Sequence, residues 1–233
     1  MSLAWGDAGY GDEFFYGVCN TLFISVCGYA VGLAIGMLGA WSKLCHVKTL
    51  NRLGDAYTTL VRSVPELLLI VLIYYAGTSA LTKFLVLLHL ADESVQINPV
   101  GAVISALALI YGAYLTDVLR GGIQAVPKGQ IEAAKAYGMH APMRFIRIVF
   151  PQMIRYAIPG MSNQWLNITK DSALVSVVGA VELVSVGRST AQSTKHYIFY
   201  YGVTALIFLS LTVVSLFFLS RLEKRANRGV RRV

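Results

Sequence analysis

Long stretches without a charged residue alternate along the chain with short stretches in which charges gather. The uncharged stretches cover residues 14–42, 67–82, 94–116, 156–169 and 196–220, with lengths of 29, 16, 23, 14 and 25 residues. A helix needs about 20 apolar residues to cross a bilayer, so the first, third and fifth stretches are long enough to span alone. The second becomes long enough if its helix begins near Tyr57 and includes Arg62 and Glu66.

This pattern predicts an all-α integral membrane protein with five transmembrane helices. The predicted spans cover residues 14–42, 57–82, 96–119, 153–170 and 196–220. Composition agrees, because 56% of the residues are hydrophobic, only 14% are charged and the mean hydropathy is +0.60. A soluble domain carries roughly 25% charged residues. The three cysteines have no CxxC spacing, so we expect neither a metal site nor a disulfide.

Positive charge is concentrated in three segments, which together hold sixteen of the 20 lysines and arginines. They are residues 43–62, residues 120–155 and the tail from Arg221 onward. With five spans these segments share one side of the membrane, and the positive-inside rule makes that side cytoplasmic. The net charge of +8 therefore reports topology, and we expect no nucleic-acid binding.

This topology places the N-terminus outside and the C-terminus in the cytoplasm. Residues 1–13 are then an extracytoplasmic tail, and residues 223–233 are a basic cytoplasmic tail. The first tail lacks the basic region of a removable signal peptide, so we do not expect it to be one. The acidic loop at Asp92 and Glu93 also falls outside.

The longest predicted cytoplasmic loop, residues 128–151, has the sequence signals of two short helices joined by a bend. Ala133 and Ala134 favour a helix, Glu132 suits its first turn, and Gly138 suits its C-terminal end. Pro142 suits the first turn of a second helix. One interpretation is an amphipathic hairpin whose arginines rest on anionic lipid headgroups.

The spacing in this loop supports a different interpretation. Glu132-Ala133-Ala134 is followed at the intervals x3, x9 and x1 by Gly138, Ile148 and Phe150-Pro151. This resembles the EAA loop of the integral membrane subunits of ABC importers, which has the form E-A-A-x3-G-x9-I-x-L-P. The one departure is Phe150 in place of Leu.

Three further segments, residues 58–65, 111–122 and 170–174, resemble the polar amino acid branch of the same family. This branch includes permease subunits for histidine, lysine, arginine and ornithine, and for octopine and nopaline. The resemblance covers roughly residues 14–222 and implies an ABC type I importer transmembrane fold in a bacterial inner membrane. It also implies a permease subunit of an importer for polar, cationic amino acids or opines.

The resemblance carries expectations about partners. It implies that Glu132, Ala133, Ala134, Gly138 and Arg144 couple this chain to a cytoplasmic dimer of ABC ATPase subunits. The chain itself has no G-x-x-x-x-G-K-[ST] motif, so we expect no enzyme activity and no cofactor here, with ATP bound by the partner. A second permease subunit, a paralogue rather than a second copy, and an extracytoplasmic solute-binding protein complete the expected complex.

Two acids near the cytoplasmic ends of predicted spans are candidates for contact with a cationic substrate. Charged groups in a membrane are costly and commonly functional. Asp117 closes the third span, and Glu66 follows Pro65 near the inner end of the second. We also assign nearby Arg62 to the pathway or its gate. Alternatively, Asp117 pairs only with Arg120, three residues on, and Glu66 only with Arg62, four residues back.

The fourth predicted span is short and polar, with Asn163 and Asn167 followed by Lys170 and Asp171. Broken polar spans are tolerated where they line a cavity or contact protein. We predict that residues 163–171 line the pathway or form its gate. The alternative is that these side chains make hydrogen bonds between subunits.

Arg188 and Lys195 belong to a polar segment expected outside, where they either meet a delivering binding protein or face solvent. Two other functions are also compatible with these residues. One is the same architecture serving neutral or anionic amino acids. The other is a self-contained secondary transporter or channel, which would leave the EAA loop unexplained.

Overall fold

The computed structural model describes residues 3–6, 9–88 and 98–227, and all of its regular structure is helical. The elements are α1 Gly11–Leu44, α2 Lys48–Ser63, α3 Glu66–Leu87, α4 Pro99–Gln124, α5 Lys128–Ala136, α6 Ala141–Arg144, η2 Phe145–Val149, α7 Phe150–Asp171, η3 Ser172–Val178, α8 Leu183–Thr194 and α9 Tyr197–Ala226. The predicted acidic loop at Asp92 and Glu93 lies outside the described residues.

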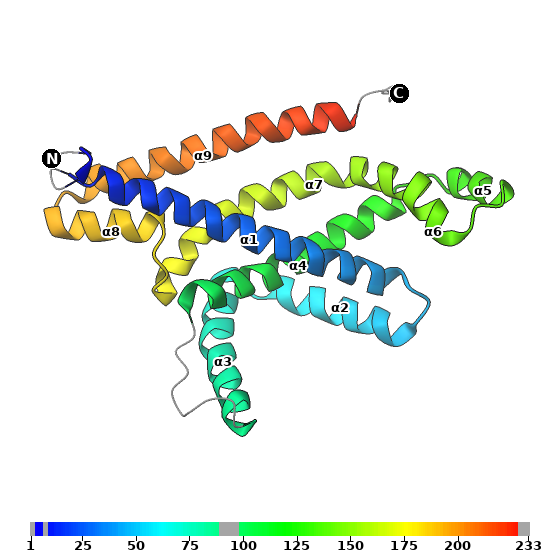
Figure 1. The fold of residues 1–233 in the computed structure, drawn as a ribbon, viewed down its shortest axis with the longest axis horizontal. Helices are drawn as coiled ribbons and strands as arrows, with labels where there is room; N and C mark the ends of the chain where they lie inside the picture. The colour runs from blue at the N-terminus through cyan, green and yellow to red at the C-terminus, as the bar shows by residue number, and fades with distance from the viewer. Residues whose placement is uncertain (1–2, 7–8, 89–97, 228–233) are drawn as a thin grey trace.

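The predicted all-α membrane architecture is confirmed. Four of the described helices, α1, α3, α4 and α9, are long and apolar enough to cross a membrane. The segment from Ala141 to Val178 and α8, which meet at an angle of 52°, make a fifth if the bent pair is one span. Figure 1 shows α5 and α6 near the end of the molecule where α9 finishes, opposite the start of α1.

A close contact between helix backbones joins α1 to α4. Gly28, Gly32 and Gly36 recur every four residues on α1 and all face α4. A Cβ atom at Gly36 would lie 2.8 Å from the Leu115 Cβ and 3.2 Å from the Thr116 backbone nitrogen. In lipid, helices associate through close packing of small residues, because apolar burial gives little advantage there. This glycine series therefore sets the position of α4 against α1.

The predicted single helix through residues 57–82 is wrong, because the chain breaks between α2 and α3. Val64 has extended backbone angles (φ −110°, ψ 138°), and Pro65 precedes the first residue of α3. Proline lacks an N–H donor and drives the preceding residue out of the helical region. Arg62 consequently ends one helix, while Glu66 begins the next.

The second helix of the predicted hairpin is also not a separate unit. From Ala141 the chain runs through α6, the π-helical turn η2 and α7 without a break. The Phe150 N–H donates to the Phe145 carbonyl across a five-residue interval. Pro151 has no N–H for the usual helical bond, which favours such a wide turn at this point. The helix that carries the predicted fourth span therefore starts inside the predicted cytoplasmic loop.

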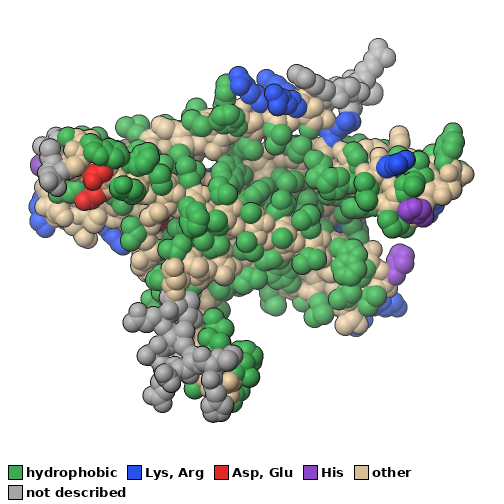
Figure 2. All heavy atoms as spheres, viewed as in Figure 1, with side chains coloured by type: hydrophobic (Ala, Val, Ile, Leu, Met, Phe, Trp, Pro, Cys, Tyr) green, Lys and Arg blue, Asp and Glu red, His purple; other side chains and the backbone are tan. Residues whose placement is uncertain are grey.

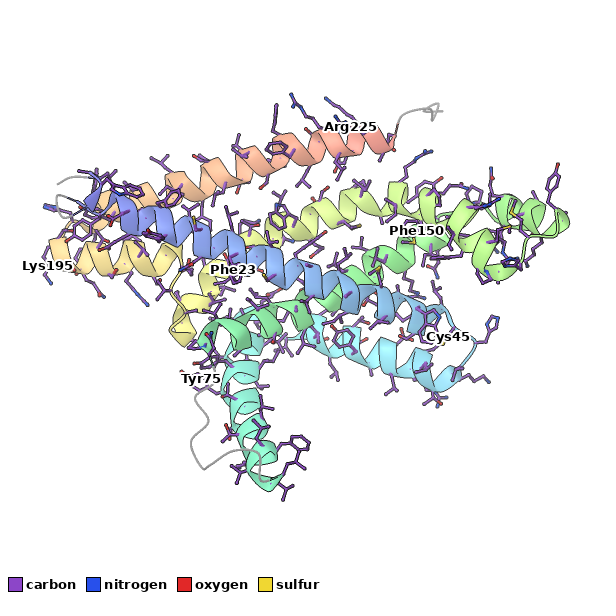
Figure 3. The ribbon with its side chains drawn as sticks, viewed as in Figure 1. Phe23, Cys45, Tyr75, Phe150, Lys195 and Arg225 are labelled. Atoms are coloured by element: carbon purple, nitrogen blue, oxygen red, sulfur yellow. The ribbon has the colours of Figure 1, made fainter. Side chains whose placement is uncertain are left out.

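Two of the apolar helices leave most of their surface uncovered within the chain. Only 6% of the apolar window of α3 and of α9 is buried. Figure 1 shows α3 projecting away from the other helices, and Figure 3 shows Tyr75 on this projecting helix. Figure 2 shows hydrophobic side chains over the middle of the visible face. These surfaces are suited to lipid or to another membrane subunit.

Candidate functional site

The predicted coupling residues lie at the tip of a helical projection. Glu132 and Ala133 are exposed, whereas Ala134 is buried beneath them. Gly138 has φ +74°, a value that strongly favours glycine. Its N–H donates to the Lys135 carbonyl, and the next N–H donates to the Ala134 carbonyl, so α5 ends in a Schellman turn. The predicted helix stop at Gly138 is confirmed.

The tip of this projection includes one further residue, which was not among the predicted coupling residues. Tyr137 has 86% of its surface exposed at the C-terminal end of α5. An aromatic side chain this exposed on a protruding helix is a common interface anchor. The sequence could have indicated Tyr137, since it lies between the alanines and the glycine of the EAA motif.

Arg144 belongs to the same tip but contacts its own loop. Its Nη1 donates to the Met139 carbonyl at 3.5 Å, across the turn that follows Gly138. The His140 Nδ1 accepts from the Met143 N–H and caps the start of α6. Arg144 therefore helps to set the angle between α5 and α6.

A second group of polar side chains lies on α4, inside the bundle. The Tyr114 hydroxyl donates to Glu66 Oε1 at 2.7 Å, and the Tyr111 hydroxyl donates to Asp171 Oδ2 at 2.5 Å. The two tyrosine rings lie 6.0 Å apart between centroids. Two carboxylates from α3 and from the end of α7 therefore converge on neighbouring tyrosines of one helix.

The interpretation that Glu66 pairs only with Arg62 is wrong. The break at Pro65 separates the two side chains onto different helices, and the carboxylate turns to Tyr114. The guanidinium of Arg62 lies over the Tyr114 ring, 5.5 Å from its centroid. Neither Glu66 nor Asp171 forms an ion pair with any residue that the structure describes.

Asp117 lies in a third group, at the cytoplasmic end of α4. One carboxylate oxygen accepts from the Lys43 ammonium at 2.9 Å, and the other forms an ion pair with Arg62. The interpretation that Asp117 pairs only with Arg120 is therefore wrong. The cations come instead from α1 and α2, because those helices pack beside the face of α4 that carries this acid.

Lys43 is the most deeply buried charge in this group. Its side chain is 5% exposed, and its ammonium contacts Thr58 Oγ1 at 2.6 Å and Asp55 Oδ1 at 3.2 Å as well as Asp117. From its position in the sequence, Lys43 was expected only to belong to the basic cytoplasmic segment. In the structure, Lys43 of α1 contacts residues of both α2 and α4 and so links the three helices.

A polar cleft of about 470 Å³ opens beside these charges, between α2 and α4. Its lining residues are Lys43, Thr58, Thr59, Arg62, Ser63, Asp117, Arg120, Gly121 and Gln124. Arg62 contacts both the cleft and Tyr114, so it joins the Asp117 group to the tyrosine group.

Three of the predicted pathway residues on α7 are not brought to either group. Asn163, Asn167 and Lys170 are exposed and, at intervals of four and three residues, share one helix face. Asp171 instead turns toward α4. Lys195 follows the last residue of α8. Figure 3 shows it at the end of the molecule opposite to Arg225, which lies near the C-terminal end of α9.

Comparison with known proteins places this arrangement in a family. Residues 32–228 match the model of the "binding-protein-dependent transport system inner membrane component" family. The chain belongs to this family. It is a permease subunit of the inner membrane and not an ATPase.

Individual relatives extend over nearly the whole permease. It is 43% identical to the nopaline transport system permease protein NocQ of Agrobacterium fabrum, covering 98% of this chain and 97% of the relative. It is 39% identical to the histidine/lysine/arginine/ornithine transport system permease protein HisQ of Salmonella typhimurium, covering 96% and 97%. It is 37% identical to the octopine transport system permease protein OccQ of Rhizobium radiobacter, covering 99% and 97%.

Solved structures agree with the predicted type I importer fold. The crystal structure of an amino acid ABC transporter with histidines matches with a TM-score of 0.79 and 29% identity, covering 93% of the permease and 95% of that chain. An inward-facing structure of the MetNI methionine ABC transporter matches with a TM-score of 0.72 and 20% identity, covering 98% and 100%. The second likeness concerns the fold alone.

Replacing Lys43 with methionine is expected to lower the thermal stability of the permease by several degrees. The change leaves a partly buried Asp117 with one cation instead of two, and losing a hydrogen bond to a charged group costs roughly 1.5–3 kcal/mol. Adding Asp117→Asn is expected to recover part of the loss, because the two groups are in contact. Melting of the detergent-solubilised protein measures both effects.

The matched control for Lys43 is Lys48→Met on α2, where the lysine is exposed. This variant is expected to melt within one degree of the wild type. Equal destabilisation by the two lysine variants would show that the buried ion pair contributes nothing particular.

Proposed function

We propose that this permease carries cationic amino acids or opines and that Glu66 and Asp171 hold the cationic group of the solute. The observation that carries the proposal is the convergence of two carboxylates, without a basic ion-pair partner among the described residues, on Tyr111 and Tyr114. A guanidinium or ammonium ion bound there would supply the missing positive charge. The tyrosine rings would add cation–π contact.

The names of the relatives support the same class of solute. The relatives are named as permeases for nopaline, for octopine, or for histidine, lysine, arginine and ornithine. All of these carry a basic group in the side chain. An anionic amino acid would meet repulsion from both acids, and a neutral one would leave them without a partner.

Asp117 has a different proposed role. Because Lys43 and Arg62 already occupy both of its oxygens, it is suited to hold α1, α2 and α4 together near the inner opening. Asn163, Asn167 and Lys170 are proposed to line the pathway on the exposed face of α7, opposite a second permease subunit. The larger exposed surfaces of α3 and α9 also suit such a subunit, for which we favour a paralogue.

The projection at α5 is proposed to couple the permease to the ATPase. Glu132, Ala133, Ala134, Gly138 and Arg144 would dock on a cytoplasmic ATPase dimer, which binds the ATP. The exposed acid and aromatic ring give contacts, and the exposed Ala133 permits close approach, while the buried Ala134 packs beneath the surface of the projection. Solute would arrive from an extracytoplasmic binding protein at the end of the molecule where α8 lies.

Replacing Glu66 with glutamine and Asp171 with asparagine together is expected to weaken binding of labelled arginine at least about 100-fold. Each change removes a charge-assisted contact worth roughly 1.5–3 kcal/mol while preserving side-chain size. Binding is measured on the purified importer complex without its binding protein, so that only the transmembrane site is read.

The matched control is Asp12→Asn plus Glu13→Gln at the start of α1, which removes two acids far from α4. It is expected to leave arginine affinity within twofold. If the Glu66 and Asp171 variant binds arginine as the wild type does, the cation site is wrong. Preferential binding of glutamine or glutamate by the wild type would favour the neutral or anionic class.

A further inference from the structure

The polar cleft between α2 and α4 carries more positive than negative charge. Of the described residues that line it, Lys43, Arg62 and Arg120 are cations and Asp117 alone is an acid. Asp55 also neutralises Lys43, but it is largely exposed and does not line the cleft. At least one cationic side chain therefore faces the cleft without a matching acid.

Arg120 is that side chain. Its Nε is buried and has no hydrogen-bond partner within the described part of the chain. Asp117, three residues before it, has both oxygens engaged by Lys43 and Arg62. Since Arg120 lines the cleft and has no ion-pair partner among the described residues, its charge is open to an anionic ligand there.

The rest of the lining is suited to an anion. Thr59 and Gln124 carry hydroxyl or amide donors, whereas the Ser63 hydroxyl already donates to the Thr59 carbonyl. Gly121 adds no side chain that would fill the space. An arginine guanidinium matches the two oxygens of a carboxylate, with which it can form two parallel hydrogen bonds. The chemistry of the cleft is therefore that of an anion site, which a carboxylate or a phosphate would fit.

We propose that this cleft is a subsite for a carboxylate of the transported solute, with Arg120 as its main ligand. The inference rests on the proposed function, because it places the cation of the same solute at Glu66 and Asp171. Arg62 connects the two places, since it touches both Tyr114 and Asp117. A solute with a basic group and a carboxylate can thus place its cation at the tyrosine cluster and its carboxylate in the cleft.

The connection through Arg62 favours the solute's own carboxylate over a free anion such as phosphate. Amino acids and opines carry a cation and at least one carboxylate in the same molecule, and the two sites present the opposite charges along one path. Octopine, an arginine derivative with a second carboxylate, is expected to depend on Arg120 more strongly than arginine does.

The test compares arginine with agmatine, which keeps the guanidinium but lacks the carboxylate. Both labelled probes are bound to the purified, complete importer complex without its binding protein. Arg120→Gln is expected to weaken arginine binding roughly 30-fold, within the range for a lost hydrogen bond to a charged group, and to leave agmatine within twofold. Arg120→Lys is expected to restore part of the arginine affinity, and octopine should lose more than arginine.

Arg52→Gln is the matched control, because Arg52 is an exposed arginine of α2 outside the cleft. Unchanged arginine binding in Arg120→Gln overturns the proposal, and so does equal weakening of arginine and agmatine, which indicates a structural role. Competition by inorganic phosphate that depends on Arg120, with arginine affinity unchanged in the variant, assigns the cleft to a free anion instead.

The two proposals fail separately in this assay. If Glu66→Gln affects neither probe while Arg120→Gln weakens arginine alone, the cation site is wrong and the carboxylate subsite stands. If Glu66→Gln weakens both probes while Arg120→Gln changes neither, the cation site stands and the subsite is wrong.

Discussion

Replacing Gly36 with leucine is expected to prevent α1 from packing on α4 and to abolish recovery of folded permease. The new Cβ would lie 2.8 Å from the Leu115 Cβ, 3.1 Å from the Leu115 carbonyl carbon and 3.2 Å from the Thr116 nitrogen. Two of these atoms belong to the α4 backbone and cannot move without displacing the helix. Overpacking in a tight core costs about 1–3 kcal/mol, and backbone contact raises the cost further.

Size-exclusion chromatography of the detergent-solubilised protein measures this effect, together with melting of any folded fraction. The control is Ala34→Leu, a similar enlargement on the exposed face of α1 two residues earlier. It is expected to give wild-type recovery. A folded Gly36→Leu protein with wild-type melting temperature would mean that the two helices are farther apart than the structure places them.

Reversing the charge of Glu132 is expected to uncouple the permease from ATP while leaving it folded. Glu132 is exposed on the projection and has no ion pair within the described residues, so the fold does not need it. At a desolvated contact with a basic partner, replacing attraction by repulsion costs roughly 2–5 kcal/mol. ATP-driven uptake by Glu132→Arg proteoliposomes should therefore fall at least about 100-fold.

The readouts are uptake, co-purification of the ATPase, and arginine binding, which should remain unchanged. Glu223→Arg, near the cytoplasmic end of α9, makes the same charge reversal outside the projection and is expected to retain uptake. Full ATP-driven uptake by Glu132→Arg would remove α5 from the coupling path. Loss of arginine binding would instead indicate damage to the fold.

The helical class and the turn after α5 were predictable because their signals are local. A long uncharged stretch predicts a membrane helix whatever that helix packs against. The glycine at position 138 has φ +74° because the chain must turn there. Pro65 carried a signal too, since proline and its predecessor rarely continue a helix. The prediction gave more weight to the apolar residues after Pro65 than to the proline itself. It therefore placed one helix where the structure has two.

The partners of the charged residues were not predictable in the same way. Arg62 and Arg120 were considered for Glu66 and Asp117 because they lie within one turn along the sequence. The structure pairs Asp117 with Lys43, 74 residues away, and Glu66 with Tyr114, 48 residues away. A side chain bonds what the packing of helices places beside it, and sequence separation does not measure that distance.

The amino-acid order alone was sufficient for membrane helices, the cytoplasmic location of the basic segments, and the EAA loop that places the chain among ABC importer subunits. These properties follow from local composition and short spacing. The tyrosine and carboxylate cluster, the burial of Lys43 and the unmatched charge at Arg120 exist only once α1, α2, α3, α4 and α7 are packed. The close contact at the α1 glycines positions α4, and α4 carries the residues on which both proposed solute sites depend.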